Sequence, residues 1–195
     1  IYLFCYAFMM LFYGTLSDSF GRRPVILSAL ALFGLSSLGA TWAPNFEWLL
    51  FCRGLQGLSG GAGMVVGQAV VRDLLQGAAA QRMLAHIMMV FGIAPAVAPV
   101  IGGYLNVGLG WQANFIFLAG VAIVLIGLTV WQLPESLKIQ ERHDFDVKTL
   151  VNSYWMAWRN RPYRWGVMAA GFSFSGLALY VSSAANFVIA VLRLK

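Results

Sequence analysis

The chain has 195 residues, of which 60% are hydrophobic and only 10% are charged, and its mean hydropathy is +0.75. Soluble domains carry about 25% charged residues, so this composition excludes an ordinary soluble protein and predicts an integral membrane protein. The apolar runs are continuous rather than alternating, which favours spanning helices over a β-barrel. The net charge of +6 comes largely from bases between these runs, where membrane proteins place them, so we expect no nucleic-acid partner.

Runs of about 20 mainly apolar residues predict membrane-spanning helices. In chain order these are residues 1–14, 25–43, 48–71, 83–105, 115–131 and 165–192. Because the first run is short and starts at Ile1, we expect the sequence to open inside a helix. We divide the chain into five spans in residues 1–132, a linker over 133–164 and a further span in 165–195. The predicted fold class is an all-α membrane protein, a polytopic helix bundle.

Bases are confined to alternate connections between these spans. The connection 14–24 and the one around 72–82 each carry two arginines, and the linker 133–164 carries six bases, whereas 43–47 and 106–114 carry none. Membrane proteins place such bases on the cytoplasmic side. We therefore place the connection 14–24 and the linker 133–164 in the cytoplasm.

The linker contains apolar residues at helical spacing. They are Val147, Leu150, Val151, Tyr154, Trp155 and Trp158. Asp146 stands where a helix cap is expected, and Arg159 and Arg161 lie near the end of the segment, where they suit the helix dipole. The pattern predicts an amphipathic helix at the cytoplasmic surface of the membrane, and a solvated linker is the alternative.

Four short motifs resemble signatures of the major facilitator superfamily of transporters. GTLSDSFGRRP (residues 14–24) resembles the loop after that family's second helix, although Ser19 stands where the family often has a base. RGLQG (53–57), followed by a glycine run, resembles the fourth-helix signature, and LPES (133–136) resembles the end of the sixth helix. APAVAPVIGG (94–103) resembles the fifth-helix signature of the family's proton-coupled drug antiporters.

The resemblance covers nearly the whole chain and is closest to antiporters of the bicyclomycin- and chloramphenicol-resistance type. It implies an incomplete bundle that holds the second to seventh helices of a transporter whose two six-helix halves rock around a central site. It also implies a proton-driven exporter of small lipophilic compounds in the bacterial inner membrane, monomeric when complete and without a cofactor or metal.

Two alternatives stay open at this point: a nutrient–proton symporter of the same superfamily, and a non-transporting membrane receptor or scaffold on this fold. An enzyme is not expected, because the sequence shows no nucleotide-binding loop, metal-ligand cluster or nucleophile triad.

The first polar connection predicts a conformational latch. Gly21 suits a tight turn, and Pro24 suits the first turn of the next helix. By resemblance, Asp18 meets a helix N-terminus in the other half when the cytoplasmic side is closed, and Arg22 pairs with Asp18 or with Asp73. The residues assigned to the latch are Gly14, Asp18, Gly21, Arg22, Arg23 and Asp73. The alternative is a solvated hairpin that only follows the distribution of positive charge.

Arg53 lies inside a predicted span, where a charged side chain costs about 2.5–3.5 kcal/mol unless it faces protein or water. It shares one helical stripe with polar and small residues, namely Gln56, Gly57, Gly60, Gly61, Met64 and Gln68. By resemblance, Arg53, Gln56 and Gly57 couple proton movement to substrate movement. The alternative is a structural arginine that reaches the outer interface about two turns away.

Small residues and prolines share the predicted span 83–105, and the prolines predict a bend. By resemblance, this helix packs against the other half near the outer gate; ordinary helix packing is the alternative. The gate residues are Gly92, Pro95, Pro99, Gly102 and Gly103.

Methionine, glutamine and aromatic side chains suit a cavity for varied lipophilic ligands. For the substrate cavity we name Met64, Gln68, Met88 and Phe91. Packing against lipid or protein is the alternative for each of them.

Overall fold

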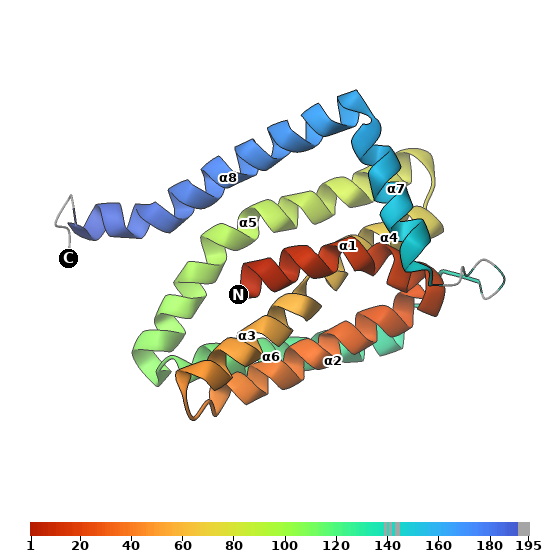
Figure 1. The fold of residues 1–195 in the computed structure, drawn as a ribbon. Helices are drawn as coiled ribbons and strands as arrows, with labels where there is room; N and C mark the ends of the chain where they lie inside the picture. The colour runs from red at the N-terminus through yellow and green to blue at the C-terminus, as the bar shows by residue number, and fades with distance from the viewer. Residues whose placement is uncertain (139, 141, 143–144, 191–195) are drawn as a thin grey trace. The chain divides into compact units, whose positions relative to one another are not determined.

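The computed structural model describes residues 1–138, 140, 142 and 145–190, without the side chains of 177, 178 and 180–190. Within this part of the sequence it contains eight α-helices (Figure 1). They are α1 (Tyr2–Phe20), α2 (Arg22–Thr41), α3 (Phe46–Gly60), α4 (Ala62–Leu74), α5 (Gly77–Leu109), α6 (Gln112–Gln132), α7 (Val147–Arg159) and α8 (Arg161–Ala190). The helices fall into two compact units, Ile1–Phe145 and Asp146–Lys195, which are described separately. The predicted all-α fold is confirmed.

The first unit contains five helical segments that are long and apolar enough to cross a membrane. They are Tyr2–Phe20, Arg22–Thr41, Phe46–Leu74, Gly77–Leu109 and Gln112–Gln132. These segments agree in number and order with the five spans predicted within residues 1–132. The sixth predicted span falls on α8, whose last side chains lie outside the described residues, so it stays a prediction.

Successive helices of the first unit run back and forth (Figure 1). The α1–α2 corner, the α4–α5 corner and the end of α6 therefore lie at one end of this unit, and the other two corners lie at the opposite end. The two groups of corners match the connections with bases and those without bases in the sequence.

Two predicted helix boundaries are wrong in the same way. The first helix continues to Phe20 rather than ending near residue 14, and α5 begins at Gly77 rather than near residue 83. The polar end of α1 is accommodated in the helix, since the hydroxyls of Ser17 and Ser19 donate to backbone carbonyls within the same helix, at 2.9 and 3.0 Å. Polar residues at the end of a span were thus mistaken for a loop.

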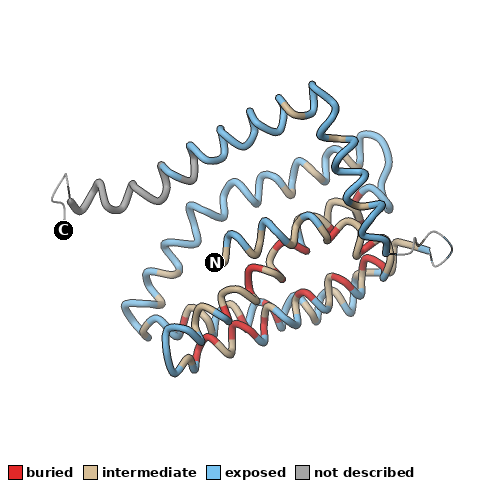
Figure 2. Tube along the Cα trace, viewed as in Figure 1, coloured by how far each residue is buried: buried red, intermediate tan, exposed pale blue. Residues whose placement is uncertain are grey.

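In the first unit, α2 packs against α3 and α6, and α1 packs along α3 and α4. The hydrophobic core cluster lies between α1, α2 and α4. Its buried residues are Tyr13, Val25, Ala29, Ala62, Val66 and Val70. Most of these side chains are small, which lets the helices approach closely. Figure 2 shows the buried positions on these helices, whereas α5 has no buried residue. The helices α1 to α4 are therefore the ones that hold the candidate site in place.

The predicted span 48–71 is broken into α3 and α4 at Gly61. The Tyr13 hydroxyl of α1 donates to the Leu58 carbonyl near this break, at 2.7 Å. A Cβ added at Gly61 would lie 2.8 Å from the Met10 side chain, so a larger residue at the break would force that side chain of α1 to move. The break is thus braced by the neighbouring helix.

The second unit consists of α7 and α8, which contact each other. Asp146 caps α7: its carboxylate accepts hydrogen bonds from the backbone N–H groups of Lys148 (2.9 Å) and Thr149 (3.2 Å) and from the Thr149 hydroxyl (2.6 Å). The Thr149 hydroxyl, followed by the Lys148 N–H, holds the pKa of Asp146 below its ordinary value. The predicted cap is confirmed, whereas the position of α7 at the membrane surface stays a prediction.

Candidate functional site

The connection between α1 and α2 is a single residue, Gly21, with φ 98° and ψ 154°. This backbone conformation is essentially restricted to glycine. The tight turn expected at Gly21 is confirmed, and Pro24 lies in the first turn of α2 as predicted. The corner is much shorter than the predicted connection, because Gly14 to Phe20 belong to α1.

Arg22 is the centre of an ion cluster at this corner, and its side chain is only 10% exposed. Its Nη1 lies 2.5 Å from Asp18 Oδ1, one turn earlier on α1, and donates to Ser17 Oγ at 2.6 Å. Its Nε donates to Asp73 Oδ2, at the end of α4, at 3.0 Å. The structure therefore brings together three predicted latch residues, Asp18, Arg22 and Asp73.

Glu135 completes this cluster, although it is not among the site residues predicted from the sequence. Its carboxylate accepts the backbone N–H groups of Arg22 (2.9 Å) and Arg23 (3.3 Å), the first two residues of α2. A helix N-terminus offers unpaired N–H groups and a positive dipole end, so a carboxylate is favourable there. A Cβ added at Gly21 would lie 2.6 Å from Glu135 Oε2, so this contact also needs glycine at the corner.

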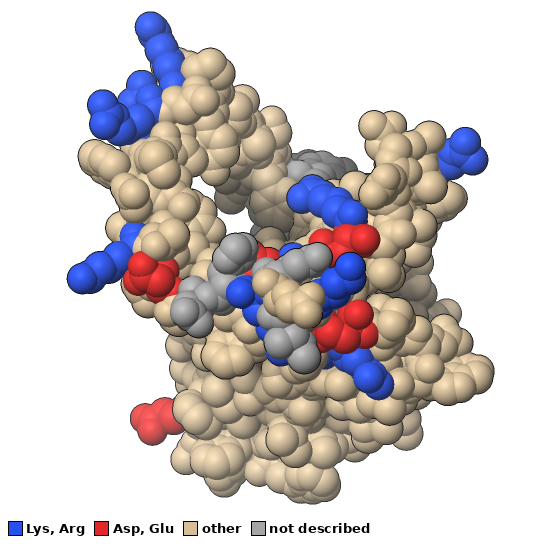
Figure 3. Space-filling model, turned by 90° about the vertical axis from the view of Figure 1, so that its right-hand side faces the viewer, with Lys and Arg blue, Asp and Glu red and all other residues tan. Residues whose placement is uncertain are grey.

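The segment after α6 holds the corner at a second point, since Ser136 Oγ donates to Asp73 Oδ2 at 3.1 Å. Arg23 has a different role from Arg22: its Nη2 donates to the Val130 carbonyl of α6, at 2.7 Å. We call Asp18, Gly21, Arg22, Asp73 and Glu135 the corner cluster. At the end of the first unit seen in Figure 3, acidic and basic side chains lie next to each other.

A second polar assembly lies inside the membrane-spanning part of the first unit. Arg53 Nη1 on α3 donates to Gln56 Oε1 at 2.9 Å, and Gln56 Nε2 donates to Ser37 Oγ on α2 at 2.7 Å. Ser37 Oγ in turn donates to the Phe33 carbonyl at 2.7 Å. The Arg53 guanidinium carbon also lies 4.6 Å from the centre of the Tyr2 ring on α1. We call Arg53, Gln56 and Ser37 the polar network.

The glycines of the predicted stripe face α1. A Cβ added at Gly57 would overlap the Tyr2 carbonyl oxygen, and it would lie 3.0 Å from Cys5 Cβ. A Cβ at Gly60 would lie 3.1 Å from the Tyr2 hydroxyl. Gly57 thus allows α1 and α3 to touch, and its expected part in proton coupling stays a prediction.

A pocket of about 370 Å³ lies between α1 and α4, next to the corner cluster. Its lining consists of Met10, Gly14, Asp18, Arg22, Met64, Val65, Gln68, Ala69 and Arg72. It therefore joins two of the predicted cavity residues, Met64 and Gln68, to three of the predicted latch residues. Met88 and Phe91 do not line it; they lie on α5, where each is about half exposed.

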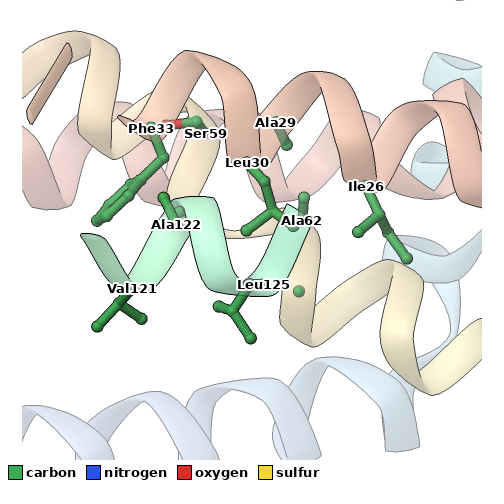
Figure 4. A pocket seen from close by; sticks show the side chains of 11 residues that line it. Ile26, Ala29, Leu30, Phe33, Ser59, Ala62, Val121, Ala122 and Leu125 are labelled. Carbon is green, nitrogen blue, oxygen red and sulfur yellow. The ribbon is translucent and has the colours of Figure 1, made fainter. Parts of the chain in front are cut away.

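A second pocket, of about 220 Å³, lies between α2, α6 and the α3–α4 break (Figure 4). The side chains drawn there are apolar except for Ser59, and its hydroxyl already donates to backbone carbonyls of Leu55 and Gln56. This pocket contains no charged side chain. It therefore suits an apolar group and provides no titrating residue.

The predicted gate residues all lie on α5. Pro95 and Pro99 are inside this helix, which changes direction along its length in Figure 1, in agreement with the predicted bend. A Cβ added at Gly92 or Gly103 would have no atom within 4 Å, while one at Gly102 would lie 3.3 Å from Asn114 Oδ1. No described helix packs tightly on Gly92 or Gly103, so the gating role stays a prediction.

Five apolar helical segments, whose connections carry bases at one set of corners only, indicate an integral membrane protein. Over residues 1–194 the sequence matches the Major Facilitator Superfamily. The chain therefore belongs to this family of transporters, as its motifs predicted.

The chain is also similar to individual proteins named for drug resistance. The chain is similar to a "Bicyclomycin resistance protein homolog" of Haemophilus influenzae, 32% identical over 177 residues, which cover 91% of this chain and 44% of the relative. It is 29% identical to "Multidrug resistance protein D" of Escherichia coli over 99% of this chain and 48% of that protein. "Multidrug resistance protein MdtL" of a Shewanella species is 33% identical over 70% of this chain and 34% of its own length. The chain thus spans less than half the length of these relatives.

Proposed function

We propose that the chain is part of a proton-coupled antiporter that exports small lipophilic compounds across the bacterial inner membrane. The observation that carries this proposal is the similarity, over 99% of the chain, to a protein named for multidrug resistance. The similarity to a bicyclomycin resistance homolog over 91% of the chain supports the same substrate class. The motif at residues 94–103, which resembles drug antiporters, favours antiport over symport.

In this proposal the corner cluster is the cytoplasmic latch. The side chain of Arg22 is held by Asp73 and its backbone N–H by the Glu135 carboxylate, whereas the side chain of Asp18 is 44% exposed. Asp18 is therefore the member of the cluster that is free to exchange partners when the two halves of a transporter move. The adjoining pocket, with Met64 and Gln68, is the place where a lipophilic substrate would pass the latch.

Arg53 supplies proton coupling in the same proposal. In this role Arg53 acts by changing the stability of a charge nearby, through the position of its guanidinium.

The full-length protein, reconstituted in vesicles that contain a pH-sensitive dye, tests this function. Addition of bicyclomycin or chloramphenicol is expected to drive proton movement opposite to the compound. Co-directional movement of compound and proton would instead establish a symporter, and binding without flux would establish a receptor. Arg53→Lys is the matched variant for the role of Arg53, because it keeps the positive charge and removes the planar guanidinium with its forked donors. Full proton-coupled transport in this variant would argue against a role that needs the guanidinium.

Asp18→Asn tests the latch within the same preparation. The variant is expected to change the transport rate and the ratio of inward- to outward-facing protein, measured by labelling of cysteines introduced on each side. Unchanged values of both quantities would rule out a latch at Asp18.

A further inference from the structure

The polar network carries an inference about a residue that neither the motifs nor the relatives single out. We propose that Ser37 is a positioning residue: it sets the orientation of the Gln56 amide and, through it, the position of the Arg53 guanidinium. Its effect on transport rests on the proposed coupling role of Arg53. Its effect on the geometry of Arg53 does not.

The chemistry of the three side chains permits one direction of hydrogen bonding. An arginine has only donors, so the group of Gln56 that faces Arg53 must be its oxygen, Oε1. The amide nitrogen of Gln56 then faces Ser37, and Ser37 must accept. The Ser37 hydroxyl proton is correspondingly directed to the Phe33 carbonyl, at 2.7 Å.

Burial prevents the alternative orientation. The side chains of Gln56 and Ser37 are among the fully buried ones, and both residues are 0% exposed. A flipped amide would set its NH₂ group against the guanidinium and its oxygen against Ser37, with no water to compensate the lost bond. Ser37 therefore holds Gln56 in the one orientation in which Arg53 has an acceptor.

The network also connects three helices. Ser37 belongs to α2, Gln56 and Arg53 to α3, and the Arg53 guanidinium lies over the Tyr2 ring of α1. The aromatic face attracts the cation but does not fix its rotation. The directional bond to Gln56 is what fixes it, so the loss of the Ser37 hydroxyl leaves Arg53 over the ring with a variable position.

Ser36 provides a matched control in the same turn of α2. Its residue is 4% exposed and its hydroxyl donates to the same Phe33 carbonyl, at 3.0 Å. It makes no bond to Gln56 among the contacts of the described residues. Ser36→Ala and Ser37→Ala therefore remove equivalent groups, and only the second breaks the path to Arg53.

A double-mutant cycle on the full-length protein tests the positioning claim without any substrate. The melting temperatures of Ser37→Ala, Arg53→Met and the double variant are compared in detergent. The loss in the double variant is expected to be clearly smaller than the sum of the single losses, because the Gln56 orientation no longer matters once Arg53 is gone. The cycle with Ser36→Ala is expected to be additive, and additivity in the Ser37 cycle would overturn the proposal.

The pH profile of transport distinguishes positioning from simple structural support. Ser37→Ala is expected to shift the pH midpoint of substrate-driven proton release, with bicyclomycin or chloramphenicol as the probe, while Ser36→Ala leaves the midpoint in place. Ser37→Thr, which keeps the hydroxyl, is expected to restore it. An unchanged midpoint in Ser37→Ala would overturn the positioning role. If the wild-type protein releases no protons, the proposed function fails, and the double-mutant cycle still decides the role of Ser37.

Discussion

The corner cluster and the polar network each contain an arginine that packs against several helices, but they surround it with different partners. Arg22 pairs with two carboxylates, of Asp18 and Asp73, at the charged end of the first unit. Arg53 has a neutral amide and an aromatic ring as its recorded partners among the described residues. Ion pairs gain strength from charge but lose it through desolvation, whereas neutral groups cost little to bury once they are hydrogen-bonded.

Because of this difference, the corner cluster is able to exchange hydrogen-bonding partners, whereas the polar network keeps its partners. Asp18 is 44% exposed, so water or another helix dipole is able to replace Arg22 as its partner at small cost. Gln56 and Ser37 are fully buried and have no such substitutes. The corner cluster is therefore suited to a switch, and the polar network is suited to keeping a charge in place while the protein moves.

The largest expected effect comes from removing each arginine in turn. Arg22→Met leaves Asp18 and Asp73 without their cation and is expected to lower the free energy of unfolding by about 3 kcal/mol. Arg53→Met removes a hydrogen bond from a neutral amide and is expected to cost about 1–2 kcal/mol. Equilibrium unfolding of the full-length protein in detergent measures both, and equal losses would contradict the comparison.

The glycine at the corner gives the next largest effect. Gly21→Ala forces a side chain into a backbone region that costs about 1–3 kcal/mol for other residues, and its Cβ would also press on the Glu135 carboxylate. Gly14→Ala is the matched control, because a Cβ there meets no atom within 4 Å and the residue is inside α1. That change is expected to stabilise the protein by about 0.5–1 kcal/mol. Equal effects of the two substitutions would show that the corner is not strained.

These two regions were predictable from the sequence to different degrees. Asp18 and Arg22 are only four residues apart across the Gly21 corner, so opposite charges there are expected to meet, and Asp73 was placed nearby because it ends a span on the same side. Gly21 was identified because a tight turn between two helices favours glycine. Local sequence was sufficient for each of these.

Glu135 and Ser37 were missed because their roles depend on contacts across the fold. Glu135 meets Arg22 across 113 residues of sequence, and no local pattern specifies such a contact. Ser37 lies 19 residues from Gln56, and a serine in an apolar helix ordinarily indicates only close packing. For residues Gly14 to Phe20 the prediction was wrong for the opposite reason, since it relied on local polarity alone. The polar residues suggested a loop, whereas two of their hydroxyls form hydrogen bonds within the helix.

A smaller difference is expected between the two acids of the corner cluster. Asp73 is 25% exposed and accepts from both Arg22 and Ser136, so Asp73→Asn is expected to cost about 1–2 kcal/mol. Asp18→Asn is expected to cost about 0.5 kcal/mol, because the pair is more exposed. Transport is expected to show the reverse order, with the larger change in Asp18→Asn. The same order in stability and transport would mean that Asp18 acts only through stability.

A change in salt concentration is expected to have the smallest effect on stability. It allows the corner cluster and the polar network to be compared by their response to ionic screening. The Debye length falls from about 10 Å at 0.1 M salt to about 3 Å at 1 M, so the exposed Asp18–Arg22 pair weakens while the buried contacts do not. The stability difference between wild type and Asp18→Asn is therefore expected to shrink by a few tenths of a kcal/mol. The difference between wild type and Ser37→Ala is expected to stay constant, because the Ser37–Gln56 hydrogen bond joins two neutral, fully buried side chains of α2 and α3. A salt dependence of the Ser37→Ala difference as large as that of Asp18→Asn would show that the polar network is reached by water and does not keep its partners.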